Sequence, residues 1–332
     1  MLQPALGVMF RCQYPPELLR AFAGQAERAG FDELWIVEDC FWGGAIASTT
    51  AALGATERIA VGLGIMPAVA RNPAFVAMEL ATLARLFPGR LLPGFGHGVA
   101  AWMQQVGALP ASQLAALEET TLAVRALLRG ERYSVGGRHV QLDQVQLDLP
   151  PRMIPPVALG VRGPKSLALA GRAADGTILA ECAAPAYVAW AREQIARGAA
   201  AAGRTEPHRL TVYAWCSVDA DGAAARAKLR PVVAATLASA EAGVQLAPLA
   251  IAGAARAMAA RGEAALCAEM PDPWLDALAV CGTPSEGAAA IERLYSAGAD
   301  SVVLVPFIDG DPLAQLESIA RDLVPLLQRG NA

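Results

Sequence analysis

Short apolar segments alternate with helical segments along the whole chain, and this alternation limits the possible folds more than any other feature. The expected strands are 6–10, 33–37, 59–66, 91–95, 157–159, 177–180, 210–218 and 301–305. Continuously apolar strands joined by helices are typical of a parallel sheet covered on both faces. Eight such units in 332 residues predict a single α/β domain over 1–332, a (β/α)8 TIM barrel with insertions. An open doubly wound sheet is the alternative, although the first strand lacks the G-x-G-x-x-G turn of a dinucleotide fold.

Two segments interrupt the alternation and are expected to be insertions. Residues 133–149 alternate polar and apolar side chains around Gly136 and Gly137, which indicates a β-hairpin. The alanine-rich stretch 231–280 predicts a helical insertion. Charged and amide side chains interrupt its apolar part, 231–258, so we expect a buried helical pair there and no membrane span.

Charge and cysteine content exclude several classes of partner. The net charge is -4 and no basic stripe interleaves with aromatic residues, so we expect no nucleic acid. None of the six cysteines is spaced as C-x-x-C, so no metal centre is expected. Scattered cysteines and no visible secretory signal predict a cytoplasmic protein.

The third expected strand, 59–66, contains two glycines near its C-terminal end. Gly62 and Gly64 weaken a strand, so each needs a reason, such as a bulge, an unusual backbone conformation or a ligand lying close. Parallel α/β folds bind their ligands at the carboxyl ends of the strands. We therefore expect a small-molecule ligand against the end of this strand.

The turn after the fifth expected strand, 160–166, is the best candidate for an anion site. Gly160 and Gly163 let the backbone approach a ligand closely, and a helix begins directly afterwards. Free backbone N–H groups at that helix start, together with Arg162 and Lys165, would favour a phosphate. An ordinary turn between a strand and a helix is the alternative.

Three polar side chains near strand ends are candidates for catalysis. His97 lies between two glycines and could donate a proton to a ligand, or bond a loop carbonyl. Asp39 could orient a cofactor or cap the next helix. Cys40 would be reactive only if its thiolate were stabilised.

Aromatic side chains near the strand ends are candidates for the wall of a substrate pocket. They are Phe10, Trp42 and Trp102. Core packing is the competing explanation for each of them.

Several of these runs together resemble one family. They are 61–67 (VGLGIMP), 71–73 (RNP), 89–98 (GRLLPGFGHG), 160–166 (GVRGPKS), 170–176 (AGRAADG), 281–284 (CGTP) and 297–300 (AGAD). In this order they resemble the bacterial-luciferase-like flavin and deazaflavin oxidoreductases. The pattern is most similar to coenzyme F420-dependent reductases of the methylenetetrahydromethanopterin reductase type.

The resemblance implies a fold, a cofactor and a set of binding residues. It implies a (β/α)8 barrel, commonly a homodimer, with a cis peptide between Gly64 and Ile65 beneath the central ring of the cofactor. The cofactor is expected to be F420, with FMN as the alternative. The implied cofactor-binding residues are Asp39, Gly64, Ile65, Gly96, His97, Gly160, Val161, Arg162, Gly163, Glu181 and Cys182.

The chain departs from the family pattern where the proton donors stand. Asp39 is followed by Cys40 where F420-dependent members often have histidine, and 99–103 contains no acid. His97 is therefore the substitute candidate, with Asp39 behind it. The leading hypothesis is an F420-dependent oxidoreductase that moves hydride between the deazaflavin C5 and a C=C, C=N or C=O group. An FMN-dependent monooxygenase and a non-catalytic flavin-binding relative are the alternatives.

Overall fold

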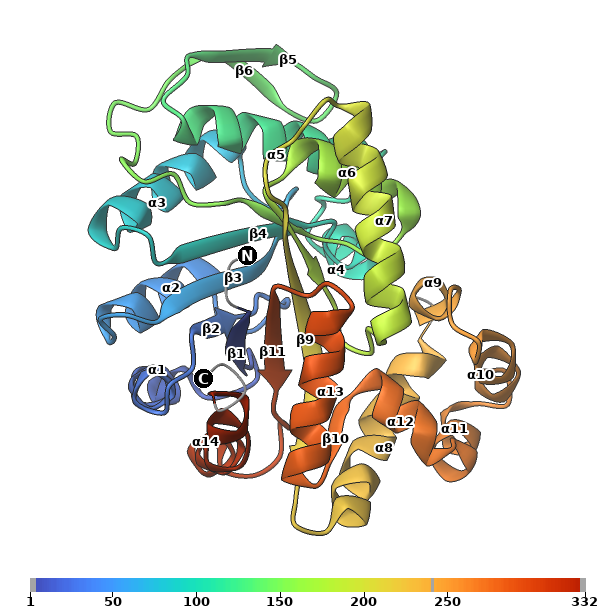
Figure 1. The fold of residues 1–332 in the computed structure, drawn as a ribbon. Helices are drawn as coiled ribbons and strands as arrows, with labels where there is room; N and C mark the ends of the chain where they lie inside the picture. Colours follow the sequence, from blue (N-terminus) through green and yellow to red (C-terminus); the bar gives the residue numbers. More distant parts are fainter. Residues whose placement is uncertain (1–3, 240–241, 329–332) are drawn as a thin grey trace.

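Eight parallel strands close into a barrel around which the helices are wrapped (Figure 1). The computed structural model describes residues 4–239 and 242–328. β9 pairs with both β8 and β11, which closes the ring and excludes the open sheet. In order around the barrel the strands are β1 (Ala5–Phe10), β2 (Glu33–Ile36), β3 (Ala60–Pro67), β4 (Leu91–Gly96), β7 (Ala158–Gly160), β8 (Gly176–Leu179), β9 (Arg209–Val218) and β11 (Ser301–Val305).

The expected helices lie on the outside of the barrel. They are α1 (Leu19–Arg28) after the short 3-10 turn η1 (Pro16–Leu18), α3 (Pro73–Leu86), α5 (Gln113–Leu128), α6 (Pro164–Ala173), α7 (Pro185–Ala201), α13 (Pro284–Ser296) and α14 (Pro312–Gln328). Two further helices are α2 (Ala45–Gly54), which joins β2 to β3, and the short α4 (Ala100–Gln105), which precedes α5. α2 has no side-chain cap of its own. Instead, Glu38 accepts the N–H of Ala45 at 3.1 Å, so the helix start is fixed by a residue outside any local capping pattern.

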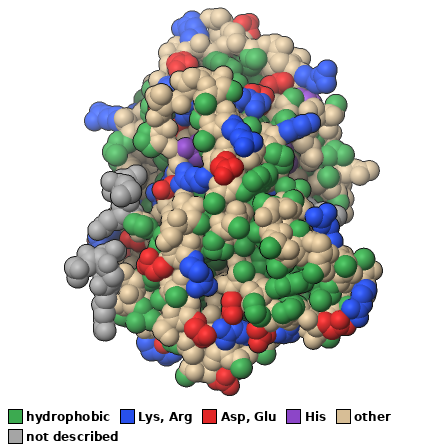
Figure 2. Space-filling model, turned by 45° about the vertical axis from the view of Figure 1, so that its right-hand side comes forward, with side chains coloured by type: hydrophobic (Ala, Val, Ile, Leu, Met, Phe, Trp, Pro, Cys, Tyr) green, Lys and Arg blue, Asp and Glu red, His purple; other side chains and the backbone are tan. Residues whose placement is uncertain are grey.

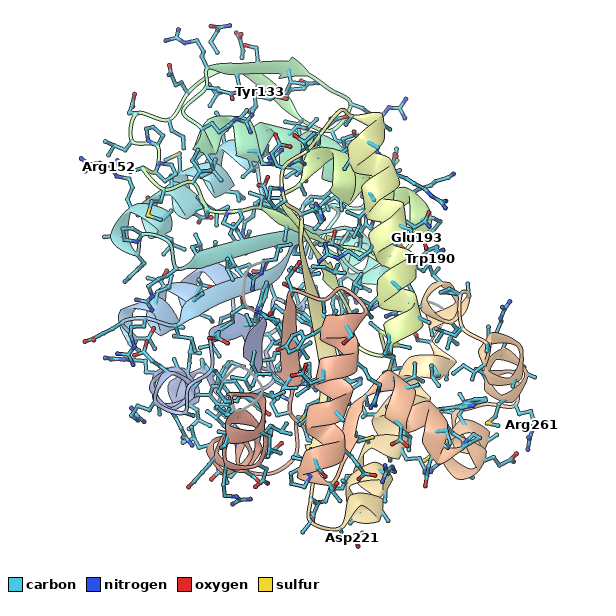
Figure 3. The ribbon with its side chains drawn as sticks, in the orientation of Figure 1. Tyr133, Arg152, Trp190, Glu193, Asp221 and Arg261 are labelled. Atoms are coloured by element: carbon cyan, nitrogen blue, oxygen red, sulfur yellow. The ribbon has the colours of Figure 1, made fainter. Side chains whose placement is uncertain are left out.

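Both expected insertions are present, at opposite ends of the view in Figure 1. The hairpin consists of β5 (Tyr133–Gly136) and β6 (Gln141–Val145), paired antiparallel; Figure 3 labels Tyr133 at its start. The helical insertion contains α8 (Gly222–Ala238), α9 (Ala242–Leu246), α10 (Ala252–Ala259), α11 (Glu263–Glu269) and α12 (Asp272–Leu278), and ends in a short strand, β10 (Val280–Gly282), which pairs with β9. Positions 240 and 241 of the expected helical pair lie outside the described residues.

Close contact between α6 and α7 fixes the helix that follows the candidate anion turn. A Cβ at Gly171 would lie 2.0 Å from the carbonyl oxygen of Ile195, and one at Gly198 would lie 1.9 Å from that of Ala168. Only glycine lets the two helix backbones approach this closely, since any side chain would overlap backbone. The orientation of α6 is therefore set by packing remote from the barrel mouth.

A buried polar cluster stands inside the barrel at the amino end of the strands. Glu33 is only 3% exposed and accepts hydrogen bonds from Trp35 Nε1 at 2.8 Å and Ser301 Oγ at 2.7 Å. Arg209 forms an ion pair with the other carboxylate oxygen of Glu33. A buried carboxylate is tolerated because these donors replace its water.

Charged side chains, both basic and acidic, are mixed with hydrophobic ones on the visible face of the molecule (Figure 2). Within the described part of the chain, no helix is long and apolar enough to cross a membrane. Among the same residues, no cluster of histidine, cysteine and acidic side chains could hold a metal ion.

Candidate active site

A cavity of about 560 Å³ opens where the barrel strands end. Its wall takes residues from the carboxyl ends of β1, β2, β3, β4, β7 and β8, together with Tyr213 from the middle of β9. That volume lies within the usual range for sites that hold small ligands and cofactors. The cavity lies where the barrel fold predicts an active site.

The end of β3 brings Ile65 into the cavity. The Gly64–Ile65 peptide is cis, as the resemblance implied, and the pairing of β3 with β4 shifts register between Leu63 and Met66. A Cβ at Gly96 would lie 1.9 Å from Ile65 Cδ1, and one at Gly160 would lie 2.6 Å from Ile65 Cγ2. These two glycines therefore leave room for Ile65, which lies across β4 and β7 and lines the cavity. Gly96 itself is buried and is not part of the cavity wall.

The cis peptide and the register shift at Gly64 are among the reasons expected for the glycines of β3, and packing inside the barrel adds another. A Cβ at Gly62 would lie 2.2 Å from the Trp35 ring, and one at Gly64 would lie 2.1 Å from the hydroxyl of Tyr213. Trp35 and Tyr213 pack edge to face inside the barrel, with ring centroids 5.5 Å apart. Two of the protein's own aromatic rings therefore occupy the space beside these glycines.

The turn between β7 and α6 forms one wall of the cavity. Gly160, Val161, Arg162 and Gly163 all line it. Gly163 is the N-cap of α6 and offers no side-chain cap, so N–H groups of the first turn remain available to an anion. Lys165 is exposed and does not line the cavity.

His97 lines the cavity with both ring nitrogens hydrogen-bonded. Nδ1 lies 3.3 Å from the carbonyl oxygen of Gln113, and Nε2 lies 3.0 Å from Ser166 Oγ. A carbonyl oxygen can only accept, so the proton is on Nδ1 and Nε2 accepts the Ser166 hydroxyl proton. Burial lowers the pKa of His97, which keeps this neutral form. In this arrangement His97 orients Ser166 instead of offering a proton to a ligand.

The end of β2 contributes acids with different surroundings. Glu38 and Asp39 both line the cavity. Glu38 forms a bidentate pair with Arg71, at 2.5 and 2.7 Å. Among the described residues, the Asp39 carboxylate accepts a hydrogen bond only from the thiol of Cys12, at 3.4 Å. Asp39 does not cap α2, since Glu38 does. Cys40 lies outside the cavity wall, and desolvation followed by the charges of Glu38 and Asp39 raises its pKa, so it is not a stabilised thiolate.

The end of β8 separates two residues that the resemblance grouped together. Glu181 lines the cavity, and its carboxylate forms no hydrogen bond or ion pair with any residue that the structure describes. Cys182 is 3% exposed, behind the wall, and burial raises its pKa to about 12. Gln245 of α9 donates to the carbonyl oxygens of residues 180 and 181, at 3.2 and 3.0 Å. The helical insertion therefore supports this edge of the site.

The three candidate wall aromatics are placed differently. Trp102 on α4 lines the cavity. Phe10 is buried in the core between Tyr14 and Phe22, and Trp42 is 58% exposed on the outside. Phe10 and Trp42 therefore form no part of the cavity wall.

Sequence reasoning missed several residues of the cavity, among them Arg11, Gln13, Glu38, Ser166 and Tyr213. Arg11 and Glu38 follow strand ends closely, a position that could have marked them. Ser166 stood in the anion turn that the sequence singled out. Tyr213 has no local signal, because it lies within an apolar strand and reaches the cavity only through barrel closure.

Comparison with known proteins identifies the family. The family described as Luciferase-like monooxygenase matches residues 8–301, which include all the strand ends that form the cavity. The chain belongs to the luciferase-like monooxygenase family. The resemblance seen in the sequence motifs is thereby confirmed.

Individual relatives of this luciferase-like chain match it from end to end. The 5,10-methylenetetrahydromethanopterin reductase of Methanolobus tindarius is 29% identical over 325 residues, covering 96% of this chain and 99% of that protein. The F420-dependent glucose-6-phosphate dehydrogenase of Kineococcus radiotolerans is 28% identical over 332 residues, covering 95% and 94%. The coenzyme F420 dependent tetrahydromethanopterin reductase of Methanopyrus kandleri superimposes with a TM-score of 0.82 at 22% identity, over 98% and 99% of the two chains. That last likeness supports the fold.

Proposed function

We propose that this protein is a coenzyme F420-dependent oxidoreductase acting on a small organic substrate. The observation that carries the proposal is the pairing of an apolar platform, Ile65, with an open helix start at Gly163 in one cavity. Full-length similarity to proteins named as reductases and F420-dependent dehydrogenases supports the choice of cofactor.

The cavity residues fit the two chemical parts of such a cofactor. Ile65, Val161 and Ile178 offer apolar surface to a flat ring system. A Cβ at Gly163 would meet nothing within 4 Å, so the start of α6 is open to a phosphate. The hydroxyl proton of Ser166 is directed to His97, so backbone N–H groups at the start of α6 are the donors on that side. Arg162 also lines this end of the cavity and would add positive charge.

F420, when bound, supplies two-electron hydride chemistry through its deazaflavin ring. The task of the chain is to hold that ring against Ile65, to orient the substrate and to keep water out. The remaining wall, with Met9, Val37 and Trp102, would then receive the substrate. This division leaves one face of the ring for the protein and the other for the reacting group.

We assign the proton-handling role to Glu181 in place of His97. The Glu181 carboxylate has no partner among the described residues, so it can exchange a proton with a substrate. His97 holds its only proton toward Gln113. Glu181→Gln should lower turnover about 10²–10⁴-fold, the usual contribution of a general acid or base, with F420 affinity retained. Asp39→Asn is the comparison variant, and an equal or larger loss there would move the role to Asp39.

Fluorescence titration of the purified protein with F420 and with FMN tests the cofactor. We expect saturable binding of F420 that is tighter than binding of FMN. Failure to bind F420 contradicts the proposal. Binding of both cofactors without turnover of any substrate would instead favour the non-catalytic relative.

An FMN-dependent monooxygenase is the second candidate, since the matching family is described as monooxygenase. It predicts oxygen consumption by the protein with reduced FMN and a substrate. An oxygen electrode separates the two activities, because hydride exchange between F420 and an organic substrate consumes no oxygen.

A homodimer and a cytoplasmic location remain predictions. Exposed aromatic and thioether side chains support the dimer: Phe41 is 64%, Phe75 66% and Met78 52% exposed. Such apolar side chains favour burial against another surface. Light scattering should give the mass of two chains, and Phe75→Glu should shift the mass toward one chain. A monomeric wild-type protein would contradict the dimer.

A further inference from the structure

Arg11 is a cavity arginine with no role in the cofactor site proposed above. It directly follows β1 and lines the cavity. β1 stands four strands away from β7 in either direction around the eight-stranded ring. Arg11 therefore lies across the barrel mouth from the anion turn at Gly163, too far round the ring to belong to the same phosphate site.

The guanidinium of Arg11 is held in place by neutral groups. Nε donates to Gln13 Oε1 at 3.4 Å, and Nη1 donates to the carbonyl oxygen of Pro306 at 3.3 Å. The same group lies over the ring of Trp215, 4.8 Å from its centroid. Stacking on an aromatic ring and bonding to a carbonyl orient an arginine without neutralising its charge.

The positive charge of Arg11 has no acidic partner within the described residues. No ion pair joins it to any carboxylate there, and Nη2 donates to no described acceptor. Asp39 and Arg11 both lie close to Cys12, since their charges act on the pKa of the Cys12 thiol in opposite directions. Asp39 accepts from the Cys12 thiol instead. An oriented, uncompensated guanidinium with free N–H donors in a cavity is suited to bind a planar oxyanion.

We propose that Arg11 binds a carboxylate of the substrate, so that the substrate is a small organic acid. This proposal rests on the proposed function, because it divides the cavity between cofactor and substrate. The apolar wall formed by Met9 and Val37 would hold the carbon skeleton beside the charged group. Arg11 is then a specificity-determining residue.

Benzoate and benzamide are the probes, because they have the same shape and differ in charge. Calorimetry measures the binding of each to the protein with and without F420. We expect benzoate to bind the wild-type protein about 10-fold or more tightly than benzamide, from charge-assisted hydrogen bonds. Arg11→Gln should weaken benzoate roughly 10- to 100-fold and leave benzamide and F420 affinity unchanged. Arg152→Gln is the matched control, an arginine at the outer edge of the molecule in Figure 3.

Arg11→Lys is the second variant. It should keep only part of the preference for benzoate over benzamide, because an ammonium group cannot form a bidentate hydrogen bond with a carboxylate. Thermal melts of every variant show whether it folds. Absence of benzoate binding to the wild-type protein, equal binding of both probes, or a preference that survives Arg11→Gln overturns the proposal. If F420 fails to bind while the free protein keeps an Arg11-dependent preference for benzoate, the cofactor assignment fails and the anion site stands.

Discussion

Replacing Gly64 with alanine tests the packing at the base of the cavity. The new Cβ would lie 2.1 Å from the Tyr213 hydroxyl and 2.9 Å from two atoms of the Trp35 ring. Ordinary contacts of a Cβ begin at about 3.4 Å. The hydroxyl must therefore move by about 1.3 Å (3.4 minus 2.1). Tyr213 is only 6% exposed, so its ring can move only by displacing core neighbours.

The expected cost follows from this overlap. Overpacking of a well-packed core costs about 1–3 kcal/mol, and two rigid rings on one side place Gly64→Ala at the upper end, about 3 kcal/mol. For a chain of this length that corresponds to a fall of roughly 5 °C in Tm. Tyr213→Phe removes the clashing oxygen and loses its 3.4 Å hydrogen bond to the Gly64 carbonyl, at about 1 kcal/mol. In the Gly64→Ala background the same change should instead recover stability.

Urea unfolding of the wild type, both single variants and the double variant measures this coupling. Gly54→Ala in α2 is the matched control, because a Cβ there meets nothing within 4 Å. It should stabilise the protein by up to about 1 kcal/mol through helix propensity. If Gly64→Ala were as stable as the wild type, or if Tyr213→Phe gave no recovery, the packing explanation for this glycine would be wrong.

Three further predictions concern pH, the barrel interior and the cofactor. Burial, followed by the charges of Arg192 and Arg204, lowers the pKa of His208 in the folded protein to about 4. As the pH falls, the unfolded chain therefore takes up a proton at His208 before the folded protein does. The free energy of unfolding should therefore fall by up to about 3 kcal/mol as the pH drops from about 6.5 to 4. Denaturant titrations across this pH range should show a weaker dependence of that free energy on pH for His208→Gln than for the wild type. Glu33→Ala should lower the free energy of unfolding by about 3–5 kcal/mol, because it leaves the half-buried Arg209 unpaired. A Tm equal to that of the wild type would contradict this. Ser166→Ala should leave F420 affinity unchanged in a fluorescence titration, because the Ser166 hydroxyl proton is directed to His97 and backbone N–H groups at the start of α6 face the phosphate. A marked loss of affinity would show that the hydroxyl itself binds the phosphate.

Much of the candidate site could be located from the sequence, because strand ends and a glycine-rich turn are local features. The turn 160–166 and the end of β3 were both identified, and both line the cavity. The role expected of His97 was harder to foresee. It depends on Gln113 and Ser166, which are 16 and 69 residues away in the chain, and a residue pattern does not show which of its nitrogens carries the proton.

The sequence by itself determined the barrel, its two insertions and the family, since hydrophobic periodicity and short motifs act within a few residues. The tertiary structure decided which side chains meet. Gly62 and Gly64 are glycines because Trp35 and Tyr213 reach them from other strands. Phe10 turned toward the core while Arg11, the next residue, lines the cavity. Only closure of the barrel brings distant strand ends around one volume, so contacts of this kind could be learned from the folded chain alone.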